Sequence, residues 1–137
     1  MSLELPLPND EAVIDASVIV EFVLGGSAAT AIGERLKGLS LHAPAHVDAE
    51  VLSAIGRIHR SGAISARDAR TRLEHALVVP VVRHELPKLI NGAWQRRQRF
   101  RLVDALYVEL ADQLSTPLLT TDVALGRATS IAEVLST

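Results

Sequence analysis

The segment AVIDAS, residues 12–17, joins a short apolar run to an aspartate and a turn-forming Ala-Ser pair. Three apolar residues in a row suit a buried strand, and Asp15 stands where that strand would end. A helix is predicted over residues 18–24, because apolar residues fill it and Gly25-Gly26 ends it. A strand that turns directly into a helix is typical of an α/β sheet, so Asp15 is expected at the carboxyl end of a parallel strand.

The same alternation continues along the chain. Helical spacing, caps and glycine stops predict further helices over residues 27–37, 46–60, 65–77, 87–97, 103–114 and 123–128. Short apolar runs predict strands over residues 41–43, 78–82 and 118–119, with a last strand or docked tail over residues 131–135. Pro80 suggests an edge position or an irregularity for strand 78–82. We therefore predict a single α/β sandwich with a mainly parallel sheet.

Size and composition narrow the possible functions. A chain of 137 residues fits one domain, and 48% apolar residues with only 3% aromatics predict an aliphatic core. The chain has no cysteine, which excludes disulfides, thiolate metal sites and cysteine nucleophiles and fits a cytoplasmic protein. Residues 1–11 contain two prolines and no signal-peptide pattern, so they are expected to form an extended lead-in to a domain over residues 12–137. No apolar run approaches the roughly 18 residues of a membrane span.

Four acidic residues follow or begin the predicted elements: Asp15, Glu50, Asp104 and Asp122. Acids at the functional edge of a parallel sheet would form an oxygen-lined pocket that suits Mg²⁺ or Mn²⁺. Two carboxylates about 4 Å apart repel by roughly 4 kcal/mol at an effective dielectric constant near 20, so a cluster needs a cation, a proton or water. Each acid also has a structural interpretation, because an aspartate after a strand is often a turn former or a helix cap.

The sequence resembles the PIN-domain ribonucleases, specifically the VapC toxins of toxin–antitoxin systems, over residues 13–127. The segments that carry the resemblance are VIDAS at 13–17, AP at 43–44 leading to EVLSAI at 50–55, DALYVELA at 104–111 and PLLTTD at 117–122. Each segment is short, but the four follow the order of the family at compatible separations.

The resemblance implies a PIN-like α/β/α sandwich with a Rossmann-like central sheet. It also implies a Mg²⁺- or Mn²⁺-dependent endoribonuclease toxin that hydrolyses structured cellular RNA, commonly tRNA or rRNA. It assigns metal binding and catalysis to Asp15, Glu50, Asp104 and Asp122. It places Ser17 and Thr120 at hydroxyl positions that orient a carboxylate or a metal-bound water. It also implies a homodimer and a small VapB-like antitoxin that covers the active-site groove.

An arginine-rich run precedes Asp104. Arg96, Arg97, Arg99 and Arg101 could guide an RNA backbone toward the acids, or could simply form a solvated helix end. Asp48 lies two residues before Glu50, and on a helix it would point well away from the site.

Two other functions fit parts of this pattern. A catalytically inactive PIN-like module that binds RNA or a partner would keep the fold without the chemistry. A signalling receiver domain also has an acidic Mg²⁺ pocket, but it normally needs a late-strand lysine, and the only lysines here are Lys37 and Lys88.

Overall fold

The structure is a computed structural model that describes residues 10–136, so nearly all of the predicted lead-in lies outside the described residues. Within this range the chain forms a parallel sheet of five strands in the order β3-β2-β1-β4-β5. The strands are β1 (Glu11–Ile14), β2 (Ser40–Pro44), β3 (Val81–His84), β4 (Leu118–Thr120) and β5 (Ala132–Val134). The prediction of a mainly parallel sheet is confirmed.

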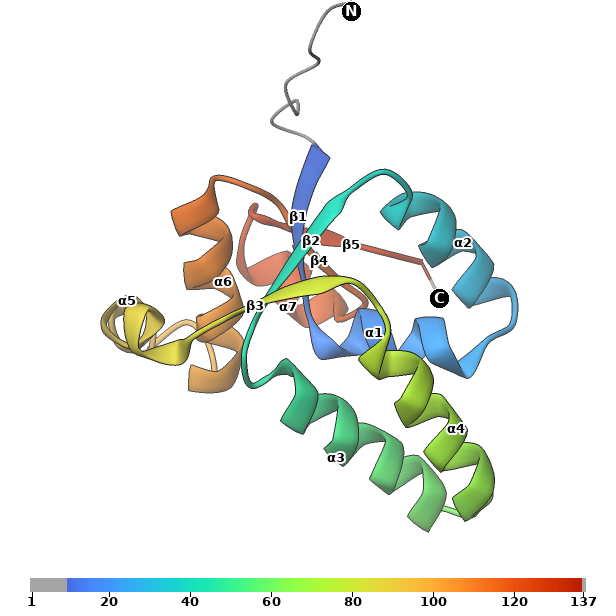
Figure 1. The fold of residues 1–137 in the computed structure, drawn as a ribbon. Coiled ribbons are helices and arrows are strands. Elements are labelled where there is room, and N and C mark those ends of the chain that lie inside the picture. Colours follow the sequence, from blue (N-terminus) through green and yellow to red (C-terminus); the bar gives the residue numbers. More distant parts are fainter. Residues whose placement is uncertain (1–9, 137) are drawn as a thin grey trace, which may run out of the picture.

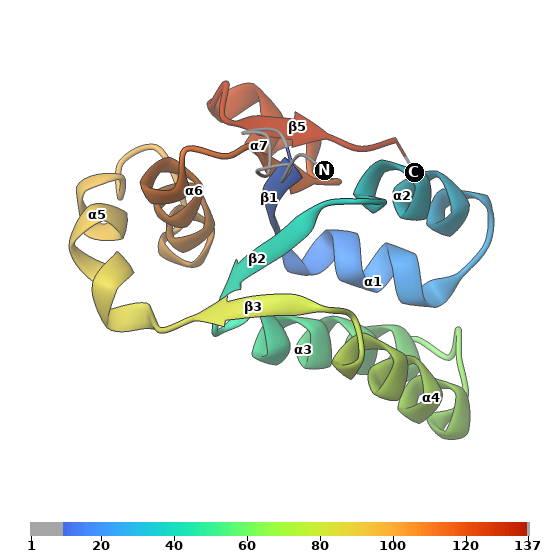
Figure 2. The ribbon, with the colours of Figure 1, turned by 45° about the horizontal axis from the view of Figure 1, so that its top comes forward.

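Helices cover the sheet on both faces (Figures 1 and 2). They are α1 (Ala16–Leu24), α2 (Ser27–Leu36), α3 (Val47–Arg60), α4 (Ala66–Leu77), the 3-10 helix η2 (Leu86–Leu89), α5 (Ile90–Gln95), α6 (Leu102–Leu114) and α7 (Val123–Ala128). Figure 2 shows α5 and α6 beside one face, while α1, α3 and α4 lie on the other. The fold is therefore the predicted α/β/α sandwich.

Aliphatic side chains fill the centre of this sandwich. The apolar residues of β1 and β4 are fully buried, as expected for central parallel strands covered on both faces. Helix α6 buries most of one side against the sheet, including Tyr107, the largest of the fully buried side chains. The core thus fixes both the strand ends and the helix that carries Asp104.

The direction in which the chain adds strands to the sheet reverses between β1 and β4. The chain moves outward from β1 through β2 to β3, then returns to the other side of β1 for β4 and β5. Crossovers of opposite direction leave a crevice at the carboxyl ends of the two strands that flank this point. Asp15 follows β1 and Asp122 follows β4, so both aspartates lie at this crevice, where each caps the next helix.

Several boundaries differ from the sequence predictions, among them the start of α1, which begins at Ala16 and not at residue 18. The strand expected at residues 78–82 begins at Val81, because Pro80 has no N–H and Val78 still caps α4 through its backbone. Its edge position is confirmed. Ser27 is the first residue of α2 rather than its cap, a place taken by Gly26 at φ 91°. The helix predicted over residues 87–97 divides into η2 and α5 and ends at Gln95.

No helix in residues 10–136 combines the length and apolar character needed to cross a membrane.

Candidate functional site

Asp15 is the most constrained acid of the site. It caps the amino end of α1 and is only 8% exposed. Its Oδ1 accepts hydrogen bonds from the Ser17 hydroxyl at 2.5 Å and the Val18 amide at 3.3 Å. Its Oδ2 accepts a hydrogen bond from the Thr120 hydroxyl at 2.5 Å. Both oxygens are therefore held in place by groups from α1 and β4.

Burial governs the acidity of this carboxyl group. Loss of water raises the pKa of Asp15, the hydrogen bonds from Ser17, Thr120 and Val18 oppose that rise, and the negative charge of Asp104 adds to it. The net direction is upward. A cation near Asp15 would favour its ionised form, so the carboxylate is suited to a bound positive charge.

Asp122 lies across the crevice from Asp15 and is tied to it through Thr120. Its Oδ1 accepts from the amides of Ala124 at 2.9 Å and Leu125 at 3.2 Å, so it caps α7. The amide of Asp122 donates to the Thr120 hydroxyl oxygen at 3.0 Å. One threonine thus contacts both aspartates.

Glu50 lies in the first turn of α3 and points toward α6. Its Oε1 accepts a hydrogen bond from the Tyr107 hydroxyl at 2.6 Å, and His46 Nε2 lies 3.5 Å from the same oxygen. His46 Nε2 is also 3.1 Å from the Val103 carbonyl oxygen, one residue before Asp104. These contacts connect α3 to the start of α6.

Asp104 is paired with a cation. Arg101 donates to it from Nε at 3.0 Å and from the guanidinium NH2 group at 3.4 Å. The hydrogen bond to Asp104 raises the pKa of Arg101, and the charges of Asp104, Glu50 and Asp122 add to this rise. The guanidinium therefore lies within the electrostatic reach of three of the four predicted acids.

Asp104 and Asp122 also share a cavity. It has a volume of about 240 Å³ and is lined mainly by the end of the arginine run, α6 and α7: Arg99, Phe100, Arg101, Asp104, Asp122, Ala124, Leu125 and Ala128. Among residues 10–136, no group of three or more histidine, aspartate or glutamate side chains is drawn together closely enough to hold one metal ion. In donor chemistry and charge the four carboxylates fit a hard divalent cation, and in this conformation Arg101 partly balances their charge.

The four arginines of the preceding run divide into two pairs. Arg99 and Arg101 line the cavity, and Arg99 also donates to the Ala128 carbonyl at 2.6 Å. Arg96 instead bridges Glu109 at 3.1 Å and Asp112 at 3.0 Å on α6. Arg97 lies over the Trp94 ring at 4.7 Å. Only the first pair is placed to meet a molecule in the cavity.

The sequence reasoning missed two residues of this site. Tyr107 lies in a segment that matches the family but carries no predicted role, and His46 is not among the predicted site residues. The spacing of His46 and Glu50, four residues apart at the start of a helix, was a usable signal. Asp48 pairs with Arg83 at 2.7 Å and 2.9 Å and lies outside the site, where the sequence argument had left it.

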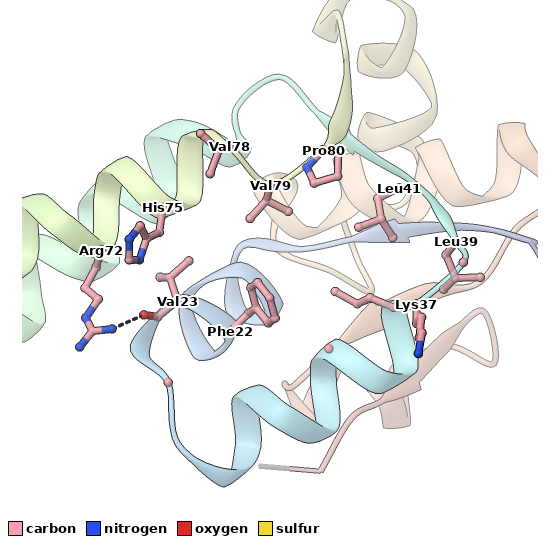
Figure 3. Close-up of a pocket in the computed structure, with 14 residues that line it drawn as sticks. Phe22, Val23, Lys37, Leu39, Leu41, Arg72, His75, Val78, Val79 and Pro80 are labelled. Carbon is pink, nitrogen blue, oxygen red and sulfur yellow. Dashed lines mark hydrogen bonds between the residues drawn. The ribbon is translucent and has the colours of Figure 1, made fainter.

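A larger cavity, about 660 Å³, lies near the opposite edge of the sheet (Figure 3). Apolar side chains such as Phe22, Leu39 and Val79 line it, together with the basic residues Lys37 and Arg72. Arg72 is anchored there by donating to the Val23 carbonyl at 2.9 Å. None of the four predicted acids lines this cavity.

Comparisons with known proteins agree on one family. Residues 12–130 match the PIN domain family model. Ribonuclease VapC3 from Mycobacterium tuberculosis is 48% identical over 122 residues, covering 88% of this chain and 89% of the relative.

The fold also matches two crystal structures. PAE2754 from Pyrobaculum aerophilum has a TM-score of 0.66 at 21% identity, covering 89% of this chain and 81% of its own. VapC20 from Mycobacterium tuberculosis, a sarcin-ricin loop cleaving toxin, has a TM-score of 0.64 at 16% identity, covering 85% and 94%. The resemblance found in the sequence is confirmed, and the chain belongs to the PIN-domain family as a VapC-like ribonuclease.

Proposed function

We propose that this protein is a Mg²⁺- or Mn²⁺-dependent endoribonuclease toxin that hydrolyses structured cellular RNA, tRNA or rRNA. The observation that carries the proposal is the fixed carboxylate of Asp15, which Ser17 and Thr120 hold at the sheet crevice beside Asp122. The similarity to ribonuclease VapC3 supports RNA as the substrate.

Each acid has a proposed role at the site. Asp15, Glu50, Asp104 and Asp122 would hold the ion and take part in catalysis, because carboxylate oxygens are the ligands that hard cations prefer. The bound ion would supply an activated water and charge relief on the phosphate. Ser17 and Thr120 keep the Asp15 carboxylate oriented through hydrogen bonds to its two oxygens. Arg99 and Arg101 would contact backbone phosphates because they line the cavity, whereas Arg96 and Arg97 contact groups outside it.

Purified protein tests this directly. RNA cleavage should require Mg²⁺ or Mn²⁺, stop with EDTA and fall by at least about 100-fold in Asp15→Asn, because a transition-state contact worth about 2.7 kcal/mol or more would be lost. Asp48→Asn is the matched control, since it neutralises an acid of the same chain outside the site. Full cleavage by a folded Asp15→Asn protein would overturn the assignment.

The alternative is a catalytically inactive PIN-like module that binds RNA or a partner. It is favoured by the structural use of Asp15 and Asp122, which both cap helices. A Mn²⁺ titration separates the two functions. A site of millimolar or tighter affinity that disappears in Asp15→Asn supports the nuclease, and no such site supports the binding module.

We also propose a VapB-like antitoxin as a partner, on the relationship to the VapC proteins. The cavity of Figure 3 is a candidate binding site for this antitoxin, because most of the side chains that line the cavity are apolar and two of them, Lys37 and Arg72, are basic. An amphipathic segment with apolar and acidic side chains would complement such a surface. Anchoring there would leave a further part of the partner to cover the acids.

A homodimer is proposed through the exposed apolar face of α5 and the start of α6. Ile90, Trp94, Leu102 and Val103 are exposed there and line one shallow cavity. Exposed apolar side chains that lie next to one another often mark a surface that binds another protein. The face adjoins Asp104, so pairing would place two sites near one another. We propose that the protein acts in the cytoplasm, where its RNA substrates are.

A further inference from the structure

Tyr107 directs its only polar side-chain atom at Glu50. The residue is 1% exposed and belongs to the apolar face of α6 that packs on the sheet. Its hydroxyl donates to Glu50 Oε1 at 2.6 Å, a short hydrogen bond of the kind made to an ionised acceptor. Burial raises the pKa of Tyr107 well above its usual range, and the Glu50 carboxylate adds to that rise. A tyrosine hydroxyl is ordinarily protonated at physiological pH, so at this distance it donates to the carboxylate oxygen of Glu50.

His46 also lies near this oxygen of Glu50. Its Nε2 lies 3.1 Å from the Val103 carbonyl oxygen, which can only accept, so Nε2 carries the hydrogen. The same nitrogen lies 3.5 Å from Glu50 Oε1, and the imidazole packs against Tyr107 with ring centroids 4.8 Å apart. His46 thus bridges Glu50 and the residue that precedes Asp104.

Both contacts fall on one oxygen of Glu50. With Oε1 held by Tyr107 and approached by His46, the second oxygen remains available to the site. A glutamate side chain on a helix surface otherwise samples many rotamers, and fixing it costs conformational entropy. The buried Tyr107 of α6 and the partly exposed His46 just before α3 restrict that freedom before any ligand arrives.

We propose that Tyr107 and His46 are positioning residues for Glu50, which fix its carboxylate so that one oxygen faces the catalytic site. The inference rests on the proposed function, because it takes Glu50 to be a ligand or water-positioning group there. Neither residue needs to touch RNA or metal itself.

Tyr107→Phe tests the proposal, because it removes one hydroxyl and keeps the buried ring. In the metal-free crystal structure of the variant, the Glu50 side chain should leave its present rotamer or become disordered. Mn²⁺ affinity, followed by electron paramagnetic resonance, should weaken by about 10- to 100-fold, the usual effect of losing a group that orients a metal ligand. KM for RNA should stay within about twofold, since the RNA surface is unchanged.

A double substitution separates positioning from general stability. If Tyr107 acts through Glu50, then Tyr107→Phe should cause no further loss of Mn²⁺ affinity in a Glu50→Gln background. Thr116→Val is the matched control, because Thr116 also carries a buried hydroxyl and lies beyond the far end of α6. For His46, Gln should preserve more affinity than Leu, since Gln can still donate to the Val103 carbonyl.

An unmoved Glu50 in the Tyr107→Phe crystal structure would overturn the proposal, as would equal losses of affinity with and without Glu50. If the wild-type protein bound no Mn²⁺, the proposed function would fall instead. The metal-free crystal structure would then decide the positioning role alone.

Discussion

The hydroxyl of Thr120 donates a 2.5 Å hydrogen bond to Asp15 Oδ2 across 105 positions of the sequence. The hydroxyl oxygen of Thr120 in turn accepts a hydrogen bond from the Asp122 amide at 3.0 Å. Since the donor lies on β4 and the acceptor follows β1, this side chain sets how the two central strand ends meet. The relative placement of two proposed metal ligands therefore depends on one threonine.

Thr120→Val should damage the site more than the fold. The variant keeps the shape of the side chain but leaves a buried carboxylate oxygen without its donor, which costs roughly 1–3 kcal/mol. RNA cleavage should fall by about 10- to 100-fold, because an oriented ligand becomes free to move. Urea unfolding and a cleavage assay measure the two effects. Thr120→Ser, which keeps the hydroxyl, should retain most activity, and full cleavage by the Val variant would refute the role.

Ionisation of Asp15 should destabilise the metal-free protein as pH rises through the raised pKa of this carboxyl group. The folded pKa of Asp15 is raised above its ordinary value of 3.8, so the folded state binds this proton more tightly than the unfolded state. The resulting stability is present at low pH and is lost as pH rises through the raised pKa, with a slope of at most about 1.4 kcal/mol per pH unit. The test compares urea unfolding of wild type and Asp15→Asn in EDTA between pH 4 and 7.5. A wild-type protein that gained stability relative to the variant with rising pH would contradict the direction.

Gly126→Ala should displace α7. A methyl group at this position would overlap Cγ2 of Val134 on β5, although alanine is the better helix former by about 1 kcal/mol. Overpacking typically costs about 1–3 kcal/mol, and here it would also shift the helix that Asp122 caps, so activity should fall as well. Val134 is 40% exposed, so Val134→Ala alone should cost little. Restored stability in the double variant would confirm the clash, and a destabilised double variant would exclude it.

Phe22→Asp should separate antitoxin binding from catalysis. Phe22 lines the apolar cavity near the opposite edge of the sheet and is 37% exposed, so an acid there is solvated in the free protein but would repel an acidic apolar partner. Co-expression with the product of a neighbouring antitoxin gene should fail to neutralise this variant, while cleavage by the free protein stays near wild type. Lys37→Ala, which removes a positive charge from the same cavity, should weaken neutralisation to a smaller extent. Normal neutralisation of both variants would place the partner elsewhere.

Trp94→Glu should weaken self-association. The Trp94 ring is 56% exposed within the apolar face of α5 and α6, and a charge there would oppose burial. Light scattering coupled to gel filtration should show a dimer for the wild type and a monomer for the variant. Val134→Ala, at an exposed position on β5, serves as the control. A monomeric wild type would remove the proposed interface.

The parts of the molecule that could be predicted from sequence are those encoded locally. The apolar runs before Asp15 and before Asp122 each predict a strand and the position where it ends. Because the two strands pair in parallel, their carboxyl ends lie side by side. Pro80 indicated an edge strand, but the run of valines around it hid where the strand begins, because β-branched residues suit both the end of α4 and β3.

Contacts between distant segments could not be predicted in the same way. The Arg101 side chain pairs with Asp104, whereas Arg96 turns toward Glu109 and Asp112, and four arginines in one short segment look alike in sequence. The hydrogen bond from Tyr107 to Glu50 depends on how α6 packs against α3. Such partners follow from packing, and periodicity in one segment carries no information about the other.

The capping roles of Asp15 and Asp122 have an evolutionary consequence. Each carboxylate begins a helix as well as facing the crevice, so selection for folding alone would retain both aspartates in a descendant that had lost catalysis. Glu50 and Asp104 accept no cap hydrogen bond at their helix starts, so helix capping alone would not retain them in an inactive descendant. On the roles proposed for the four acids, the joint presence of a glutamate on α3 and an aspartate on α6 would therefore be the better marker of a working nuclease in chains of this fold.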